Sequence, residues 1–224
     1  MKASPAFALA EIMVAVVLAT VVMLGLFAIF SSTFSFQKQG SIKDKARSGE
    51  LMSLESMSRD LEAATYVNSP SSSTVSDQYG SVLSGCANFD PRIASILGTD
   101  GRIDGTKSVH AFAYCVDSNG KLWYFAEDNN TAAQIPALCK PATPYTCVTL
   151  TATGLPGGVP APLYQSAPVV LAQPVSLDSC GTSCQNYFRR PVNVSDLVEL
   201  HYVVGTSTSA ATVNTGIAFV GALR

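Results

Sequence analysis

One apolar run near the start of the chain constrains its fold more than any other feature. Residues 12–30 carry no charged side chain, and only Thr20 and Gly25 interrupt the apolar sequence. As a helix, this run would be about 28 Å long, close to the thickness of the hydrocarbon core of a bilayer. It therefore predicts a membrane-spanning helix. A cleaved secretory signal is the weaker alternative, because the run is longer than a typical signal core and residues 31–34 form a poor cleavage site.

A carboxylate stands at the very start of this run. Glu11 follows Phe7 and three further apolar residues. A carboxylate at the edge of a membrane span is costly and usually has a partner. The alternative is that Glu11 lies at the depth of the lipid headgroups and stays solvated.

The helical pattern continues beyond the run but becomes one-sided. No proline occurs between Phe7 and Asn68. Apolar residues recur at steps of mostly three and four, at Ile42, Ala46, Leu51, Leu54, Met57, Leu61 and Ala64. Residues 7–64 therefore predict one helix of about 85 Å. Its first half is apolar all round, and its second half has one apolar stripe that would carry a globular domain.

The rest of the chain has the pattern of an antiparallel β domain, with short apolar runs between turn-forming residues. The predicted strands are 109–116 and 121–126, joined by an Asn-Gly turn, then 168–172, and the pair 197–204 and 213–223. Residues 68–84 are rich in serine and predict a linker or surface loop. Together with the long helix, this predicts an α+β fold with a small antiparallel sheet as its head.

All six cysteines lie in the predicted head, at Cys86, Cys115, Cys139, Cys147, Cys180 and Cys184. An even number confined to one region predicts disulfides that staple long loops in an oxidising compartment. The short spacings favour Cys139–Cys147 and Cys180–Cys184, which would leave Cys86 to pair with Cys115. Zinc is the alternative, but these spacings do not form the usual pair of Cys-x2-Cys hooks.

Motifs for catalysis and cofactor binding are missing from the sequence. The two histidines, His110 and His201, fall on predicted strands, and no nucleophile elbow, phosphate-binding loop or dinucleotide fingerprint occurs. We therefore expect neither an enzyme nor a cofactor. Calcium stays open as a ligand of the acidic loops 100–105 and 117–120, although neither has EF-hand spacing and both contain ordinary turn residues.

The charge balance bears on partners and on topology. With 14 Lys+Arg against 16 Asp+Glu, nucleic acid is not the expected main partner. The adjacent basic residues Arg189 and Arg190 are predicted to form a solvated surface pair, and a contact with DNA or an acidic partner, together with Lys140, is the alternative. Basic residues follow the apolar run, which by the positive-inside rule alone would leave the head in the cytoplasm. We expect the opposite orientation, because acidic residues neighbour those charges, the N-terminal amine adds a positive charge inside, and cysteine usage indicates an oxidising compartment.

The start of the chain resembles the class III signal of type IV pilins and secretion pseudopilins. A short leader, residues 1–6, precedes Phe7-Ala8-Leu9-Ala10-Glu11 and the apolar run. In that family a prepilin peptidase cuts before the phenylalanine and methylates the new amino group. The resemblance implies a cut between Ala6 and Phe7, with Ala6 where the family usually has glycine. It also implies that Glu11 neutralises the charged N-terminus of a neighbouring subunit in a filament core.

Two further segments narrow the resemblance. Residues 58–64 and the Ser84-Gly85-Cys86 sequence are similar to PilW-type minor pilins and to J-type minor pseudopilins of type II secretion. The implied organisation is a leader at 1–6, a transmembrane or filament-core helix at 7–30, an amphipathic helix at 31–65 and a β-rich head at 66–224. The implied location is the bacterial inner membrane, crossed once with the head in the periplasm, and then a pilus or pseudopilus.

The resemblance implies a minor pilin that assembles into, primes or caps a pilus. Its partners would be other pilin or pseudopilin subunits, prepilin peptidase, the membrane and the inner-membrane assembly platform. A minor pseudopilin of a secretion pseudopilus is the alternative within the same class. A different class also stays open, namely a membrane-anchored binding module, such as an adhesin or DNA receptor, that does not polymerise.

Overall fold

The structure, a computed structural model, describes residues 5–90, 95–96, 108–129, 139–141, 145–148, 150, 168–177, 186–194, 196–206 and 210–218. The chain divides into two compact units, residues 1–44 and 45–224. Helix α1 (Pro5–Ala63) is the long helix that the sequence predicts, and antiparallel sheets follow it, so the predicted α+β fold is confirmed. Alanine, leucine and methionine favour the helix, and no proline interrupts it after its first residue.

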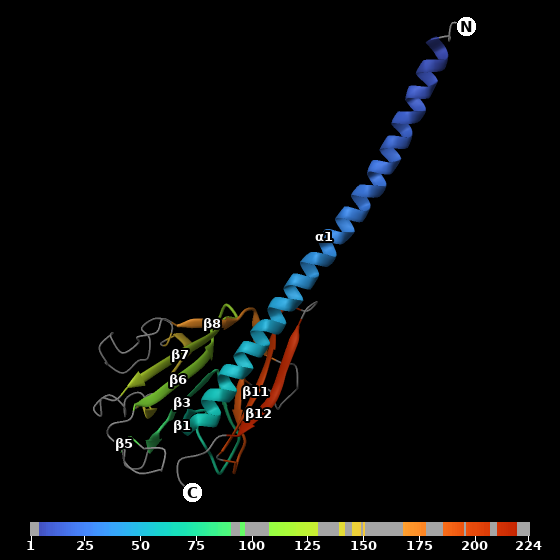
Figure 1. The fold of residues 1–224 in the computed structure, drawn as a ribbon. Coiled ribbons are helices and arrows are strands. Elements are labelled where there is room, and N and C mark those ends of the chain that lie inside the picture. Colours follow the sequence, from blue (N-terminus) through green and yellow to red (C-terminus); the bar gives the residue numbers. More distant parts are fainter. Residues whose placement is uncertain are drawn as a thin grey trace. The chain divides into compact units, whose positions relative to one another are not determined.

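The first sheet of the unit 45–224 holds five antiparallel strands in the order β1-β3-β6-β7-β8 (Figure 1). The strands are β1 (Ala64–Ser69), β3 (Val82–Ala87), β6 (Val109–Val116), β7 (Leu122–Asn129) and β8 (Val169–Ala172). The predicted Asn-Gly hairpin is confirmed as β6 and β7. Gly120 supplies the turn with a φ of 67°, and its N–H donates to the carbonyl of Asp117 at 3.0 Å.

The second sheet has the order β12-β11-β10-β2, and a short strand, β9, also pairs with β11. These strands are β2 (Gln78–Gly80), β9 (Val175–Leu177), β10 (Phe188–Arg190), β11 (Leu197–Val204) and β12 (Ala211–Ala218). Two-residue strands β4 (Phe89–Asp90) and β5 (Ser95–Ile96) pair separately. The predicted pairing of 197–204 with the next strand is confirmed as far as Ala218, and residues 219–223 of that prediction lie outside the described residues.

The serine-rich segment 68–84 is more structured than the sequence predicts. It contains the end of β1, all of β2 and the start of β3, so its interpretation as a linker or loop is wrong in part. β2 has no run of apolar residues, and its backbone pairs with β10 from Gln78 to Gly80. This pairing depends on a partner about 110 residues away, as Arg189 opposite Tyr79 shows, and local patterning carries no sign of it.

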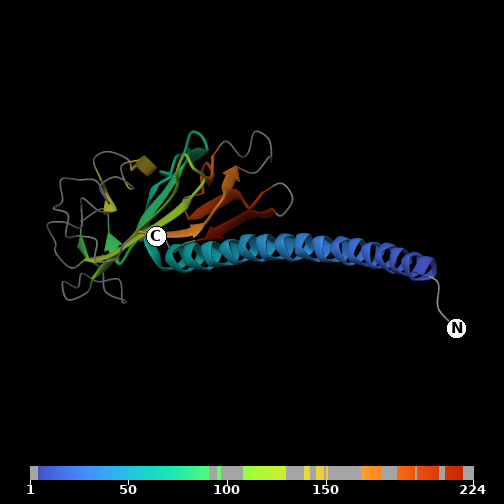
Figure 2. The same cartoon turned by 90° about the horizontal axis from the view of Figure 1, so that it is seen from above.

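The core lies on both faces of the first sheet. On one face, the end of α1 packs against both sheets, as Figures 1 and 2 show from two directions. Met57 and Leu61 are fully buried there, together with Phe112 and Leu200. The second cluster, on the other face, includes Phe125 and four cysteines. Within β7, Tyr124 packs on the first cluster while its neighbours Trp123 and Phe125 join the second, as strand alternation requires.

Two disulfides cross the second cluster, but not with the predicted partners. Cys86 pairs with Cys139 and Cys115 with Cys147, with Cα–Cα distances of 5.6 and 5.4 Å. The predicted pairs Cys139–Cys147 and Cys86–Cys115 are therefore wrong. The register of β3 on β6 sets Cys86 opposite Ala111, four residues from Cys115. Four residues span about 13 Å along a strand, beyond the reach of a disulfide. The pair Cys180–Cys184 lies outside the described residues.

Candidate functional site

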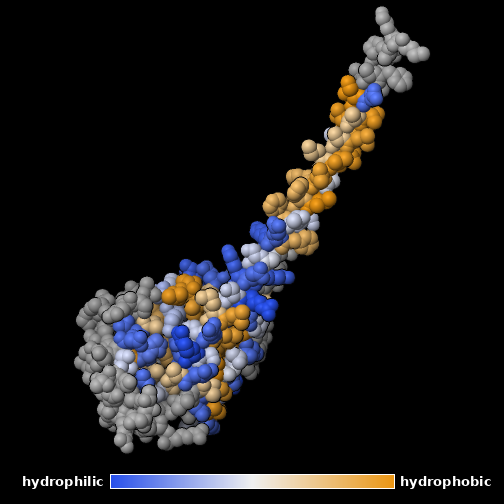
Figure 3. Space-filling model, in the orientation of Figure 1, coloured by the Kyte–Doolittle hydropathy of each residue, from blue (hydrophilic) through white to orange (hydrophobic). Residues whose placement is uncertain are grey.

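The first part of α1 exposes an apolar surface over its whole circumference. Every described side chain from residue 11 to residue 38 is exposed, including Phe27 at 74% and Phe36 at 70%. The orange colour of hydrophobic residues dominates this part of α1 in Figure 3, with hydrophilic residues at its two ends. Among the described residues, one helix is long and apolar enough to cross a membrane, and this segment is its apolar part. Water-soluble surfaces rarely carry an apolar patch of this extent, which indicates lipid or other helices as its surroundings.

Three hydroxyl groups of this segment donate to carbonyls within the helix. Thr20 donates to the carbonyl of Val17 at 2.8 Å, and Thr33 to that of Ile29 at 2.9 Å. Ser35 likewise donates to the carbonyl of Ser32 at 2.7 Å. These bonds reduce the polarity that the three hydroxyl groups add to the helix surface. Glu11 then remains as the one charged residue between positions 11 and 36.

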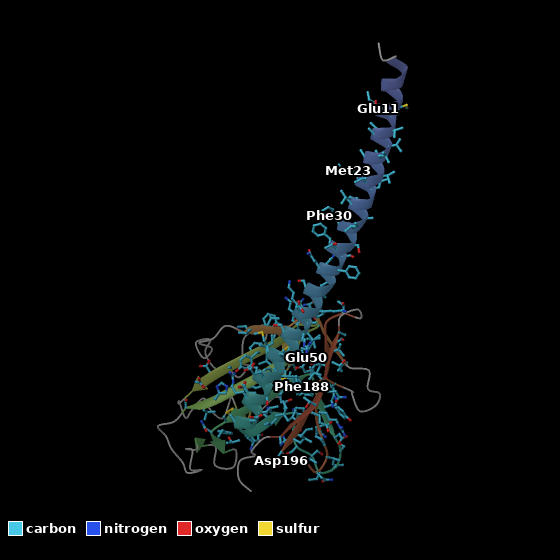
Figure 4. The ribbon with its side chains drawn as sticks, turned by 45° about the vertical axis from the view of Figure 1, so that its right-hand side comes forward. Glu11, Met23, Phe30, Glu50, Phe188 and Asp196 are labelled. Atoms are coloured by element: carbon cyan, nitrogen blue, oxygen red, sulfur yellow. A yellow bond between two sulfur atoms is a disulfide. The ribbon has the colours of Figure 1, made fainter. Side chains whose placement is uncertain are left out.

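The two residues that the resemblance marks for assembly both lie at the start of α1. Phe7 is the third residue of the helix, and Glu11 follows one turn later with an exposed side chain. Figure 4 shows Glu11, Met23 and Phe30 along the same helix, with their side chains directed away from its axis. Glu11 therefore presents its carboxylate on a surface that is otherwise apolar. Ala6, the residue before the implied cut, also lies within α1.

The last part of α1 is held to both sheets by two hydroxyl pairs, one buried and one partly buried, as well as by apolar contacts. The hydroxyl oxygens of Ser53 and Tyr202 are 2.8 Å apart, and those of Ser56 and Tyr114 are 2.9 Å apart. Tyr202 lies on β11 and Tyr114 on β6, so one helix contacts a strand of each sheet. These contacts position the helix within the unit 45–224.

A buried carboxylate lies near the end of α1. Asp60 is 2% exposed and accepts a hydrogen bond of 2.7 Å from the Tyr114 hydroxyl. Its other oxygen is 3.1 Å from Arg59 Nε and 3.8 Å from His110 Nε2. The Nδ1 atom of the same imidazole lies 2.8 Å from Asp128 Oδ1. His110 is thus placed between one carboxylate from α1 and one from β7.

The pKa values of Asp60 and His110 shift in the directions expected for a carboxylate paired with an imidazolium. Burial alone would raise the pKa of Asp60, but the contacts with His110, Tyr114 and Tyr124 outweigh it and hold the pKa below its usual value. Asp60 is also the main reason that the pKa of His110 is raised; burial opposes this shift and Asp128 supports it. Burial beside the same carboxylate raises the pKa of Tyr114. The cluster therefore favours a carboxylate facing an imidazolium.

The predicted solvated pair Arg189 and Arg190 is wrong. Arg189 lies between Asp77, at 2.7 Å from its Nη2, and Glu199, at 2.6 Å from its Nη1. Arg190 is 6% exposed and donates to the carbonyls of Val67 and Pro70. Burial lowers the pKa of Arg190 to about 10. Both guanidinium groups therefore connect segments of the head, which a sequence count of charges does not reveal.

The remaining sequence candidates have local partners. His201 lies 3.2 Å from Glu199, and His110 belongs to the Asp60 cluster. In the loop 117–120, the Asp117 carboxylate accepts from the N–H groups of Asn119 and Lys121 and from Trp123 Nε1. The acidic loop 100–105 lies outside the described residues. Within the described part of the chain, no three His, Cys, Asp or Glu side chains are grouped to hold a metal ion.

Sequence reasoning missed the Asp60 cluster altogether. Its members come from α1, β6 and β7, and Asp60 is 54 residues from Tyr114. No spacing within one element indicates such a group. The one local hint is an acidic residue, Asp60, directly beside the apolar stripe position Leu61.

Comparisons with protein-family models, with curated proteins and with solved structures return no match for this chain. Arguments about its function therefore rest on its own residues.

Proposed function

We propose that this chain is a minor type IV pilin-like subunit that assembles into, primes or caps a pilus after processing by prepilin peptidase. The observation that carries the proposal is the start of α1. There Phe7 lies in the first turn of the helix, and a single carboxylate, Glu11, follows one turn later at the start of an exposed apolar segment. The last part of the same helix is buried in a β-rich unit with two disulfides. This combination fits a subunit that waits in a membrane and then packs its helix among others.

The apolar surface requires a non-aqueous environment. Sixteen large apolar side chains between residues 12 and 36 are exposed. At roughly 1.5 to 3 kcal/mol for each, burying them is worth a few tens of kcal/mol. A bilayer and a filament core both supply this gain, so it does not by itself favour one over the other. Transfer from membrane to filament then requires a more specific interaction.

Glu11 supplies such an interaction in the proposed mechanism. After a cut between Ala6 and Phe7, the new amino group of Phe7 would carry a positive charge into the apolar core. An isolated charge in apolar surroundings costs several kcal/mol, whereas a paired charge costs much less. The Glu11 carboxylate of one subunit would pair with the Phe7 ammonium of its neighbour. Helix packing and this pair together would select correctly aligned subunits.

The disulfides support the periplasmic location that this mechanism requires. Disulfides form in oxidising compartments, which supports a head on the periplasmic side of the bacterial inner membrane. Other pilin subunits, prepilin peptidase and the inner-membrane assembly platform would be the partners. A minor pseudopilin would use the same chemistry in a secretion pseudopilus, and the genes beside this one would separate these two assignments.

The first test measures, by mass spectrometry, the residue at which the chain begins in cells with and without prepilin peptidase. We expect a peptidase-dependent chain that begins with methylated Phe7. A chain that still begins with Met1, or one cut near residue 31, would refute the proposal and favour a membrane-anchored or secreted binding module.

The second test is the incorporation of variants into sheared filaments. We expect Glu11→Gln to abolish incorporation without changing the amount of chain in the membrane, because the Phe7 amine loses its partner. Glu50→Gln, which removes a partly exposed carboxylate elsewhere on α1, is the matched control and should assemble normally. Equal incorporation of both variants would refute the role of Glu11, whereas absence of the unaltered chain from sheared filaments would favour the non-polymerising binding module.

A further inference from the structure

An open groove of about 750 Å³ lies between α1 and β12 in the unit 45–224. Leu51, Leu54, Glu55 and Glu62 line it from α1, and the last four residues of β12 form the other side. β12 is the edge of its sheet, and among the described strands none pairs with its outer side. The groove thus combines apolar side chains with two exposed carboxylates, Glu55 and Glu62.

Leu51 is the residue that makes this groove unusual. The apolar stripe of α1 predicts it to be in the core, together with Met57 and Leu61. Those two are fully buried, whereas Leu51 is 59% exposed and faces the groove. The stripe prediction is therefore wrong at Leu51. A single exposed leucine is ordinary, so an occupant must be argued from a second feature of the chain.

That second feature is a complementary face on α1 itself. Phe36, Gly40, Lys43 and Arg47 follow one another at steps of four, three and four, which places them along one face of the helix. The side chains of Phe36, Lys43 and Arg47 are exposed. Around Gly40, a Cβ atom would meet nothing within 4 Å beyond the neighbouring backbone of its own helix, so another helix can approach closely there. The face thus offers one aromatic ring and two cations.

The residues of the groove and those of the complementary face have the same spacing along α1. Phe36 precedes Leu51 by 15 residues, and Arg47 precedes Glu62 by the same 15 residues. Two parallel copies of α1 displaced by 15 residues, about 22 Å, therefore bring both pairs together at once. Lys43 then lies opposite position 58, one turn from Glu55. The copies must be parallel, because both would leave the same membrane with the same orientation.

We propose that the groove between α1 and β12 binds residues 36–47 of a second copy of this chain. The proposal rests on the proposed function, since a displacement of about 22 Å between neighbours requires that one subunit has been lifted relative to the other. The contact joins two different surfaces and does not close on itself, so it can repeat along a filament. Exposed ion pairs contribute little energy, and their role here is to set the displacement between neighbours.

A site-specific photo-cross-linker tests the contact in the full chain in cells. A benzophenone amino acid at position 51 should yield a covalent dimer, with the attachment point within about one turn of Phe36 of the second copy. The same probe at position 52 is the matched control. Met52 is 54% exposed and adjacent in sequence, but it does not line the groove. A dimer from position 51 alone supports the proposal. No dimer, or attachment to another segment, another protein or lipid, overturns it.

Charge reversal provides an independent test of the register. Arg47→Glu alone and Glu62→Arg alone should each lower the yield of the position-51 dimer about three- to tenfold, because each sets like charges against one another. The double variant should restore the yield to within about twofold of the original chain. Both residues are exposed, so neither change disturbs the core. A double variant as poor as either single one would overturn the proposed register.

These tests separate this proposal from the proposed function. A chain that is processed at Phe7 and enters filaments, but gives no position-51 dimer, refutes the groove contact and leaves the proposed function standing. A chain that retains Met1 in the presence of prepilin peptidase refutes the proposed function. The product formed at position 51 then still decides whether the groove binds a second copy.

Discussion

Replacing Asp60 with asparagine should weaken the head in a pH-dependent way. Asp60 is 2% exposed and lies 3.8 Å from His110 Nε2. At an effective dielectric constant of 20, that separation corresponds to an attraction of about 4 kcal/mol, which the desolvation of both groups reduces. Asparagine keeps the shape and can still accept from the Tyr114 hydroxyl. We therefore expect the free energy of unfolding to fall by about 1 to 3 kcal/mol.

The direction of the pKa shifts sets the pH window of this loss. The pKa of Asp60 is lowered by folding, so its contribution is present above the unfolded value of about 4 and is lost as pH falls through the folded pKa. The pKa of His110 is raised, so its contribution is present below about 6.5 and is lost as pH rises through the folded pKa. The pair should therefore stabilise the head most between about pH 4 and 6.5, and Asp60→Asn should cost more at pH 5.5 than at pH 8.5.

Urea unfolding of the full chain in detergent micelles measures this loss. Trp123 is the single tryptophan and packs, partly buried, against the second core cluster, so its fluorescence reports on the head. Asp44→Asn, which neutralises an exposed carboxylate of α1, controls for net charge and should change the free energy of unfolding by less than about 0.5 kcal/mol. An equal loss for Asp60→Asn at pH 5.5 and pH 8.5 would refute the argument from the His110 pair.

Two further changes test the packing of α1 and the disulfide pairing. Met57→Ala should lower the free energy of unfolding by about 2 to 5 kcal/mol, because Met57 is fully buried. Met52→Ala, at an exposed position, should change it little. Urea titration of both variants checks this, and equal effects would contradict the burial of Met57. Non-reducing peptide mapping should recover Cys115 linked to Cys147. Replacing both cysteines should lower the free energy of unfolding by about 2 to 5 kcal/mol. Recovery of Cys139 linked to Cys147 would contradict the structure.

The sequence is most informative where an interaction lies within one element. The helix depends on residues three and four apart and on the absence of proline, and the predicted range 7–64 matches Pro5–Ala63 closely. The β6–β7 hairpin depends on an Asn-Gly turn between two apolar runs, and it also forms as predicted. Trp123, Tyr124 and Phe125 alternate between the two core clusters for the same local reason.

Predictions from the sequence fail where a residue's surroundings come from a distant segment. The disulfide partners follow from the register of β3 on β6, which neighbouring residues do not reveal. Arg190 is buried because carbonyls more than 100 residues away accept its hydrogen bonds. Leu51 fits the apolar stripe of α1 by spacing, yet the sheets cover the face that carries Met57 and Leu61 and leave Leu51 exposed.

The features of the candidate site likewise fall into those that follow from neighbouring residues and those that depend on distant segments. The apolar run and the placement of Glu11 beside Phe7 are properties of the sequence itself, because a helix keeps neighbours in the chain as neighbours in space. The exposure of Leu51 beside β12, and the burial of Asp60 between Tyr114 and His110, arise only when strands distant in sequence pack on the helix. Helical periodicity determines which side chains share a face of α1, and tertiary packing decides which of those faces is buried.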